Sequence, residues 1–282
     1  MSNTALTVQT HSASIENRKI AYRRIGSGTP IILANRFRGT LDTWDPLFLD
    51  LLAEKNTVIT FDYPGIGYSE GGELPINIKD VAQEVIRLAD NLNIDKFHLL
   101  GWSYGTFVTQ YATWLVQDRV LSNTVIGGNP VGKNEVPLEP LFLELALKPN
   151  YEFEDWVSIF FEPASVKSRA AAKASTDRIY QRLDWSKVPS TQEQIERYIA
   201  GMQSAAEDSL SVREGYKTLE VPTFAISGDH DISLAVENWF PLLKNAPSLQ
   251  HFILHGAGHA PHYQSPELIV GYIQNFHNQI KK

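Results

Sequence analysis

The chain has 282 residues, of which 43% are hydrophobic and 20% are charged, and its net charge at pH 7 is −7. This length fits one large α/β domain with or without a smaller insertion, and the composition is that of an ordinary globular protein. An acidic chain without clustered basic residues is not expected to bind nucleic acid. No apolar run approaches the ~20 residues that cross a bilayer, and residues 1–20 lack the apolar segment of a secretory signal. We therefore expect a cytoplasmic protein that does not bind a membrane.

The first half of the chain alternates strand-like and helix-like segments. Short runs rich in β-branched residues indicate strands, and apolar residues three and four positions apart indicate helices. The strand-like segments are 12–26 (two short strands with a turn at Glu16–Asn17), 30–35, 56–62, 96–103 and 120–128, and the helical ones are 41–55, 78–94 and 104–118. This alternation is typical of parallel βαβ units, with helices on both faces of the sheet.

The pattern changes in the middle of the chain and then returns. Residues 130–219 contain no strand-like run and instead carry helical stretches rich in aromatic residues and interrupted by prolines. Strand-like runs return at 221–229 and 249–258. We therefore predict an α/β core of residues 1–129 and 220–282, with a helical lid of residues 130–219 inserted into it.

Side chains suited to nucleophilic catalysis follow three of the predicted strands. Ser103 stands between two glycines after one strand, Asp229 and Asp231 follow a second, and His259 follows a third. In an open parallel sheet, functional groups gather at the carboxyl ends of the strands. The order serine, aspartate, histidine along the chain is that of a nucleophile, an orienting acid and a base.

Four motifs in this order resemble those of the α/β-hydrolase superfamily. "GWSYG" resembles its nucleophile elbow, "FDYPGIGYSE" the segment after its fourth strand, "SGDHDISL" its acid loop and "GAGHAPHYQSPE" its histidine loop. The resemblance covers nearly the whole chain. It implies an α/β-hydrolase fold, a mostly parallel doubly wound sheet with an inserted helical lid, and a serine nucleophile.

The resemblance also implies a role for each residue of the site. Ser103 is the nucleophile, His259 takes its proton, and an aspartate orients the imidazole. The family spacing, counted from Gly228, favours Asp231 as this acid. Asp229 is then expected to be an exposed turn or capping residue.

The loop after the third strand departs from the family pattern. Asn35 and Arg36 stand where many relatives have His-Gly, although Gly39 keeps the final glycine of that motif. By the resemblance, the backbone N–H groups of Phe37 and Tyr104 form the oxyanion hole. A backbone donor does not require a particular side chain, so the hole remains possible without the usual glycine.

Two arginines of this loop allow two interpretations. Arg36 or Arg38 could bind a substrate carboxylate or support the oxyanion, since guanidinium groups suit bidentate anion recognition. Alternatively they pair with Asp42, Asp45 or a carboxylate at the end of the sheet and only hold the loop, which is the interpretation we favour. Arg36, Arg38 and Trp102 are therefore retained as possible substrate-binding residues.

No metal site is predicted. His251, His255, His259 and His262 fall within twelve positions. The first two are expected on a strand and the last two on a loop, and no cysteine or separate carboxylate cluster completes a set of ligands. The absence of cysteine excludes disulfides, zinc–thiolate sites and a cysteine nucleophile. By the resemblance, Asp62 in "FDYPGIG" is expected to tether its loop rather than to act in catalysis.

We expect a serine hydrolase that acts on a small carboxylic ester or lactone through an acyl-enzyme and needs no cofactor. A carbon–carbon bond hydrolase or a cofactor-free perhydrolase would use the same triad. From other classes of function, a small-molecule receptor with little turnover, or a structural partner-binding protein, remains an alternative. The sequence predicts neither the natural substrate nor the oligomeric state.

Overall fold

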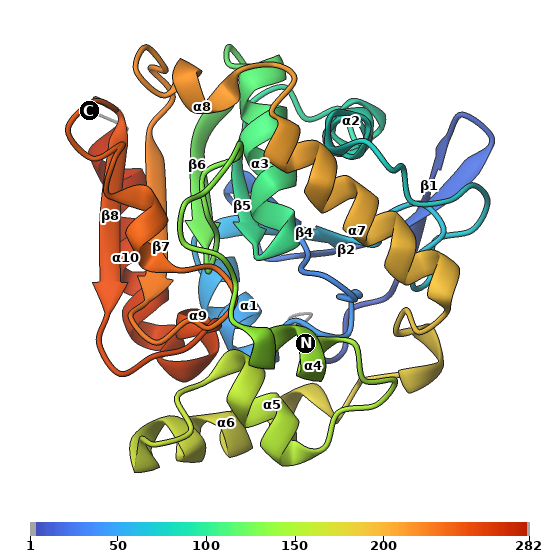
Figure 1. The fold of residues 1–282 in the computed structure, drawn as a ribbon. Coiled ribbons are helices and arrows are strands. Elements are labelled where there is room, and N and C mark those ends of the chain that lie inside the picture. Colours follow the sequence, from blue (N-terminus) through green and yellow to red (C-terminus); the bar gives the residue numbers. More distant parts are fainter. Residues whose placement is uncertain (1–3, 281–282) are drawn as a thin grey trace.

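The computed structural model describes residues 4–280, which are built around one eight-stranded sheet (Figure 1). The strands are β1 (His11–Ile15), β2 (Arg18–Ile25), β3 (Thr29–Ala34), β4 (Asn56–Phe61), β5 (Phe97–Trp102), β6 (Val120–Ile126), β7 (Thr223–Gly228) and β8 (Leu249–Leu254). They lie in the order β1-β2-β4-β3-β5-β6-β7-β8. The pairs β1–β2 and β2–β4 are antiparallel, and the remaining pairs are parallel. The predicted mostly parallel sheet is confirmed.

A hairpin forms one edge of the sheet, and β5 lies near its centre. β1 and β2 form a hairpin whose turn is Glu16 and Asn17, both with positive φ, as the sequence predicts. β5 lies in the middle, between β3 and β6. The carboxyl end of β5 is therefore surrounded by other strand ends, which is where an open parallel sheet places a site.

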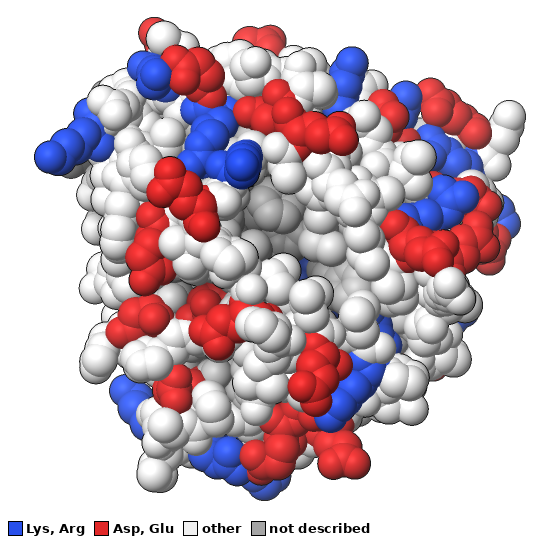
Figure 2. All heavy atoms as spheres, viewed as in Figure 1, with Lys and Arg blue, Asp and Glu red and all other residues white. Residues whose placement is uncertain are grey.

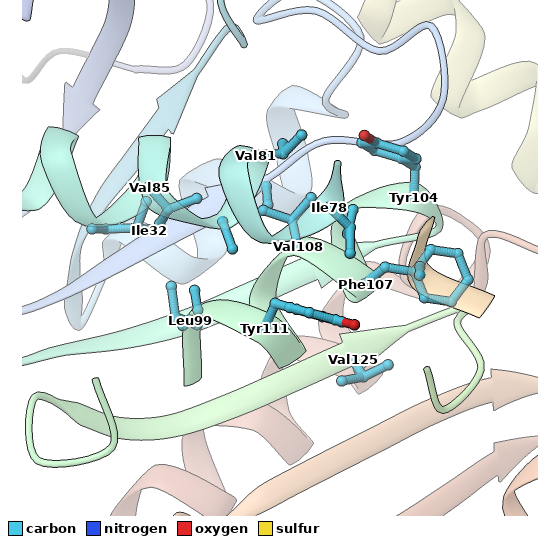
Figure 3. Packing of buried hydrophobic residues seen from close by; sticks show 14 of the residues in the cluster. Ile32, Ile78, Val81, Val85, Leu99, Tyr104, Phe107, Val108, Tyr111 and Val125 are labelled. Atoms are coloured by element: carbon cyan, nitrogen blue, oxygen red, sulfur yellow. The ribbon is translucent and has the colours of Figure 1, made fainter. Parts of the chain in front are cut away.

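Helices cover both faces of the sheet (Figure 1). They are α1 (Pro46–Ala53), α2 (Ile78–Asn91), α3 (Tyr104–Leu115), α9 (Pro261–Gln264) and α10 (Pro266–Ile280). Neighbouring residues of a strand point to opposite faces, so Ile32 of β3 belongs to the core under α2 and α3, whereas Ile31 and Leu33 belong to the core under α1 and α10. Figure 3 shows the first core, in which Val81 and Val108 of the two helices lie over the sheet. Each such buried aliphatic side chain stabilises the fold by about 1.5–3 kcal/mol.

A helical segment lies between β6 and β7. It contains α4 (Pro140–Ala146), α5 (Phe153–Phe160), α6 (Val166–Ile179), the 3₁₀ turn η1 (Trp185–Lys187), α7 (Gln192–Glu207) and α8 (Val212–Gly215), and a further turn, η2 (Val236–Trp239), follows β7. Ser165 and Thr191 cap the N-termini of α6 and α7 with their hydroxyl groups. Figure 1 shows α4, α5 and α6 beyond the carboxyl ends of the strands and α7 running past α3. The segment occupies the place expected for a lid, and its action as a lid stays a prediction.

Within the part of the chain that the structure describes, none of the helices combines the length and the apolar character required to cross a membrane.

Candidate active site

Ser103 occupies a strained turn between β5 and α3. Its backbone has φ 55° and ψ −120°, a conformation that costs a residue with a side chain about 1–3 kcal/mol. Two glycines allow this turn, because a Cβ on Gly101 would lie 2.4 Å from Gly105 O and a Cβ on Gly105 would lie 2.1 Å from Ala34 O. The sequence "GWSYG" therefore folds here as an elbow that holds the serine at the end of the central strand.

The hydroxyl of Ser103 is not used to cap the helix that follows it. The Ser103 backbone is held by its N–H, which donates to Ile126 O at 3.0 Å, and by its carbonyl, which accepts from Thr106 Oγ1 at 2.6 Å. Its side chain makes no capping hydrogen bond to α3. Oγ is thus left uncommitted at the N-terminus of a helix, where the aligned peptide dipoles favour negative charge.

Asp231 and His259 are brought together by the loops that follow β7 and β8. His259 Nδ1 lies 2.7 Å from Asp231 Oδ2, and the two side chains are only 1% and 0% exposed. The other carboxylate oxygen, Oδ1, accepts hydrogen bonds from the backbone N–H groups of Ser233 and Leu234 at 2.8 and 3.0 Å. Both oxygens of Asp231 are therefore fixed, and one of them orients the imidazole.

His259 lies beside the strand ends that hold Ser103. Trp102, the residue before Ser103, donates from Nε1 to His259 O at 3.1 Å. Gly127, which follows β6, approaches the histidine so closely that a Cβ there would lie 3.1 Å from His259 Nδ1. Within residues 4–280, no hydrogen bond joins Ser103 Oγ to His259 Nε2, and such contacts often close only when substrate binds.

Trp102 is a buried neighbour of this site rather than part of its surface. Its ring is fully buried, lies 6.2 Å from the His259 ring and packs edge-on against His262 and Tyr263 at 4.7 Å. With its N–H bonded to His259 O, it supports the histidine loop. The expectation that Trp102 contacts substrate is not supported by this placement.

Asp229 holds the same two loops together at a different point. Its carboxylate lies 2.7 Å from the Nδ1 atoms of both His230 and His255 and accepts from Gly256 N at 2.7 Å. Burial would raise the pKa of Asp229, but the hydrogen bonds from His230 and His255 outweigh it and lower the pKa to about 2. Asp229 lies in a turn, as expected, but it is only partly exposed and bridges the acid loop to the histidine loop.

Two backbone N–H groups are free within residues 4–280, that of Phe37 in the loop after β3 and that of Tyr104 at the start of α3. In the described chain, neither Phe37 N nor Tyr104 N donates to another protein group. Asn35 shapes the loop: its Oδ1 accepts from Arg36 N at 2.9 Å and its Nδ2 donates to Thr40 O at 2.6 Å. This arrangement is compatible with the expected oxyanion hole, whose formation stays a prediction.

The two arginines of this loop do not pair with the carboxylates we expected. Asp42 is bonded to Arg23 at 2.6 Å and Asp45 to Arg178 at 2.6 Å. Our favoured interpretation of Arg36 and Arg38 was therefore wrong in its partners. Both guanidinium groups are buried, and within residues 4–280 neither forms an ion pair.

Arg38 joins the loop to the helical segment through backbone carbonyls. Its acceptors are Pro189 O at 2.7 Å, Lys148 O at 2.6 Å, Pro149 O at 2.8 Å, Ala146 O at 3.2 Å and Tyr151 Oη at 3.2 Å. Arg38 itself has φ 57°, a conformation that is costly for a residue with a side chain. Its five hydrogen bonds offset that cost and fix the loop against residues on both sides of α5 and α6.

Asp62 tethers the neighbouring loop, as predicted. It is buried, and its two oxygens accept from Leu41 N at 2.7 Å and Tyr68 N at 2.8 Å. Burial raises the pKa of Asp62 to about 7, against the opposing effect of these two hydrogen bonds. No cluster of three metal-ligating side chains occurs among residues 4–280.

Figure 2 shows a hollow near the centre of the face that Figure 1 presents, in the region of the N-terminus of α3.

A parallel sheet with a serine elbow at its central strand, and an acid and a histidine on the loops of two later strands, defines an α/β hydrolase. The chain matches the model of the alpha/beta hydrolase family over residues 37–271, and it belongs to this family.

Known proteins of this kind resemble the chain over different lengths. An alpha/beta hydrolase fold protein from Chitinophaga pinensis is 26% identical with a TM-score of 0.85, and the match covers 97% of this chain and 98% of that one. The soluble epoxide hydrolase of Corynebacterium sp. is 23% identical over 92% of this chain and 94% of its own length. The dihydrolipoyllysine-residue acetyltransferase component of the acetoin cleaving system of Pseudomonas putida is 32% identical over 43% of this chain. That match spans only 33% of the Pseudomonas protein.

Proposed function

We propose that the protein is a serine hydrolase that cleaves a small carboxylic ester or lactone. The observation that carries the proposal is the buried 2.7 Å contact of His259 with Asp231, in a loop bonded to the residue before the strained Ser103. A serine hydroxyl is a weak nucleophile until a base takes its proton, and an oriented imidazole is such a base.

The proposed reaction has two halves. Ser103 Oγ attacks the substrate carbonyl while His259 Nε2 accepts its proton, and the developing oxyanion is held by Phe37 N–H and Tyr104 N–H. The C–O bond to the leaving alcohol then breaks, and His259 returns the proton to that oxygen. Water adds to the acyl-enzyme by the same route and releases the acid. Asp231 keeps Nε2 of the imidazole free to act as the base and stabilises the imidazolium.

Hydrolysis of short p-nitrophenyl esters, with fluorophosphonate labelling mapped by mass spectrometry, tests the proposal. We expect turnover and a label on Ser103, both lost in Ser103→Ala. The matched control is Ser122→Ala, another buried serine, which lies on β6 and should keep both signals. Neither turnover nor label in the folded wild type would overturn the proposal and favour a small-molecule receptor.

A further inference from the structure

Arg36 is a buried cation without an anionic partner. The residue is only 4% exposed, and within residues 4–280 its side chain forms no ion pair. Its Nη1 donates to Phe37 O at 2.7 Å, whereas its buried Nε has no acceptor. A guanidinium offers five donors and remains charged in proteins, so most of its hydrogen-bonding capacity is unused.

Other buried or half-buried arginines in this region have acceptors. Arg23 and Arg178 meet the carboxylates of Asp42 and Asp45, and Arg38 meets four backbone carbonyls and a tyrosine hydroxyl. Among these four arginines, only Arg36 has a buried guanidinium nitrogen without an acceptor in the described chain. Burying an isolated charge is costly, which makes an acceptor from outside the chain the natural complement.

Three aromatic rings surround the Arg36 guanidinium. Its central carbon lies 4.8 Å from the ring centre of Phe160, 5.3 Å from that of Trp102 and 5.5 Å from that of Trp156. A cation–π contact from which water is excluded stabilises the cation by about 2 kcal/mol. The rings hold the guanidinium in place but supply no hydrogen-bond acceptor.

The position of this cage connects it to the proposed reacting centre. Trp102 precedes Ser103, and the rings of Trp102 and Phe160 both lie 6.2 Å from the His259 ring. Arg36 also directly precedes Phe37, the expected oxyanion donor. An anion bound by Arg36 would therefore belong to a molecule that also reaches Ser103.

We propose that Arg36 binds a free carboxylate on the acyl part of the substrate, so that the preferred substrates are monoesters of short dicarboxylic acids, or lactones that carry a free carboxylate. A carboxylate is planar, carries two acceptor oxygens and matches the donor fork of a guanidinium. The inference rests on the proposed hydrolase function and adds the substrate class. Burial, the leading influence, lowers the pKa of Arg36, and this opposition to the charged form is relieved when an anion binds.

Two matched esters test the inference. Mono-p-nitrophenyl glutarate and p-nitrophenyl pentanoate differ only in a terminal carboxylate against a methyl group. We expect the wild type to prefer the glutarate ester at least tenfold in kcat/KM, as a charge-assisted hydrogen bond implies. In Arg36→Met this preference should disappear, because kcat/KM for the glutarate ester falls at least tenfold further than kcat/KM for the pentanoate ester, and Arg36→Lys should keep part of the preference. Arg24→Met, which removes an exposed arginine of β2, controls for net charge.

Binding without turnover separates this inference from the proposed function. Glutarate should bind Ser103→Ala protein in calorimetry, and the double variant with Arg36→Met should bind it at least tenfold more weakly. Glutarate binding that depends on Arg36, in a protein that hydrolyses no ester, would keep the inference and reject the hydrolase. Hydrolysis of pentanoate with no glutarate preference, or an equal loss of both esters in folded Arg36→Met, would overturn the inference alone.

Discussion

Asp231 Oδ2 lies 2.7 Å from His259 Nδ1 between two buried side chains, whereas Asp229, two positions earlier, contacts His255 at the same distance outside the core. One short acidic loop thus holds two histidines of the next loop for different purposes. The inner pair has the geometry of an oriented base, and the outer pair closes the two loops on each other.

Replacing Asp231 should lower catalytic activity, whereas replacing Asp229 should mainly lower stability. Asp231→Asn is expected to lower kcat by about 10³-fold or more, because an amide favours the wrong imidazole tautomer and cannot stabilise the imidazolium. Asp229→Asn should keep kcat within a few-fold. Steady-state kinetics on one p-nitrophenyl ester compares the two variants, with circular dichroism to verify folding. Comparable kcat losses in both would contradict the assignment of Asp231.

Asp229→Asn should instead destabilise the protein in a pH-dependent way. The Asp229 carboxylate raises the pKa of His230, so the folded state holds that proton more tightly than the unfolded state does. This stabilisation is complete below about pH 6.5, the ordinary value for histidine, and is lost as pH rises through the raised value. Urea unfolding should show a cost of about 1 kcal/mol at pH 5.5 and a smaller one at pH 8.5. An equal cost at both values would refute this account.

His262 should be a point where an apolar substitution stabilises the fold. It is fully buried among Trp102, Phe48 and Tyr263, and in the described chain neither ring nitrogen has a hydrogen-bond partner. Burial, aided by His259, lowers the pKa of His262 well below its usual range. His262→Phe, or the smaller His262→Leu, is expected to raise the free energy of unfolding by about 1 kcal/mol.

The gain from His262→Phe should grow in acid. Below about pH 6.5, His262 binds a proton in the unfolded chain but stays neutral in the folded protein. The free energy of unfolding of the wild type therefore decreases as pH falls. Chemical unfolding of the wild type and the variant at pH 7.5 and pH 5 measures the difference. A gain that shrinks at pH 5 would show that His262 is protonated in the folded state.

Arg38→Met should destabilise the loop after β3 together with the helical segment. It removes the donors to Ala146, Lys148, Pro149 and Pro189, and we expect a loss of about 3 kcal/mol or more with faster proteolysis within residues 146–190. Arg38→Gly is the matched variant, because glycine accepts a φ of 57° without strain and should recover about 1 kcal/mol. Wild-type stability in Arg38→Gly would mean that backbone strain, not the hydrogen bonds, governs this position.

The sequence predicted the parts of the site that depend on local order. A strand, a serine between two glycines and a helix can fold only as a tight elbow, and Gly101 and Gly105 show the close approaches that require it. The strand ends then brought Ser103, the pair Asp229 and Asp231, and His259 to one edge of the sheet. The choice of Asp231 came from the resemblance to the family. The short strands on either side of Glu16 and Asn17 likewise predicted the hairpin turn.

The partners of the charged side chains could not be predicted in this way. Asp42 forms an ion pair with Arg23, 19 positions away, and Asp45 forms one with Arg178, 133 positions away. Both were plausible partners of Arg36 and Arg38 by proximity in sequence. Which cation reaches a buried carboxylate depends on how α6 packs on the core, and one sequence carries no signal for that packing.

The contacts of Arg38 also bear on how the enzyme would meet its substrate. The carbonyls of residues 146–149 and 189 belong to the helical segment, while Arg38 directly follows Phe37 in the loop after β3. A movement that carries residues 146–149 and 189 away from this loop would break these bonds and loosen the peptide next to the expected oxyanion donor. If substrate entered by such a movement, the open protein would lack an ordered oxyanion loop, and that loop would order again only on closure.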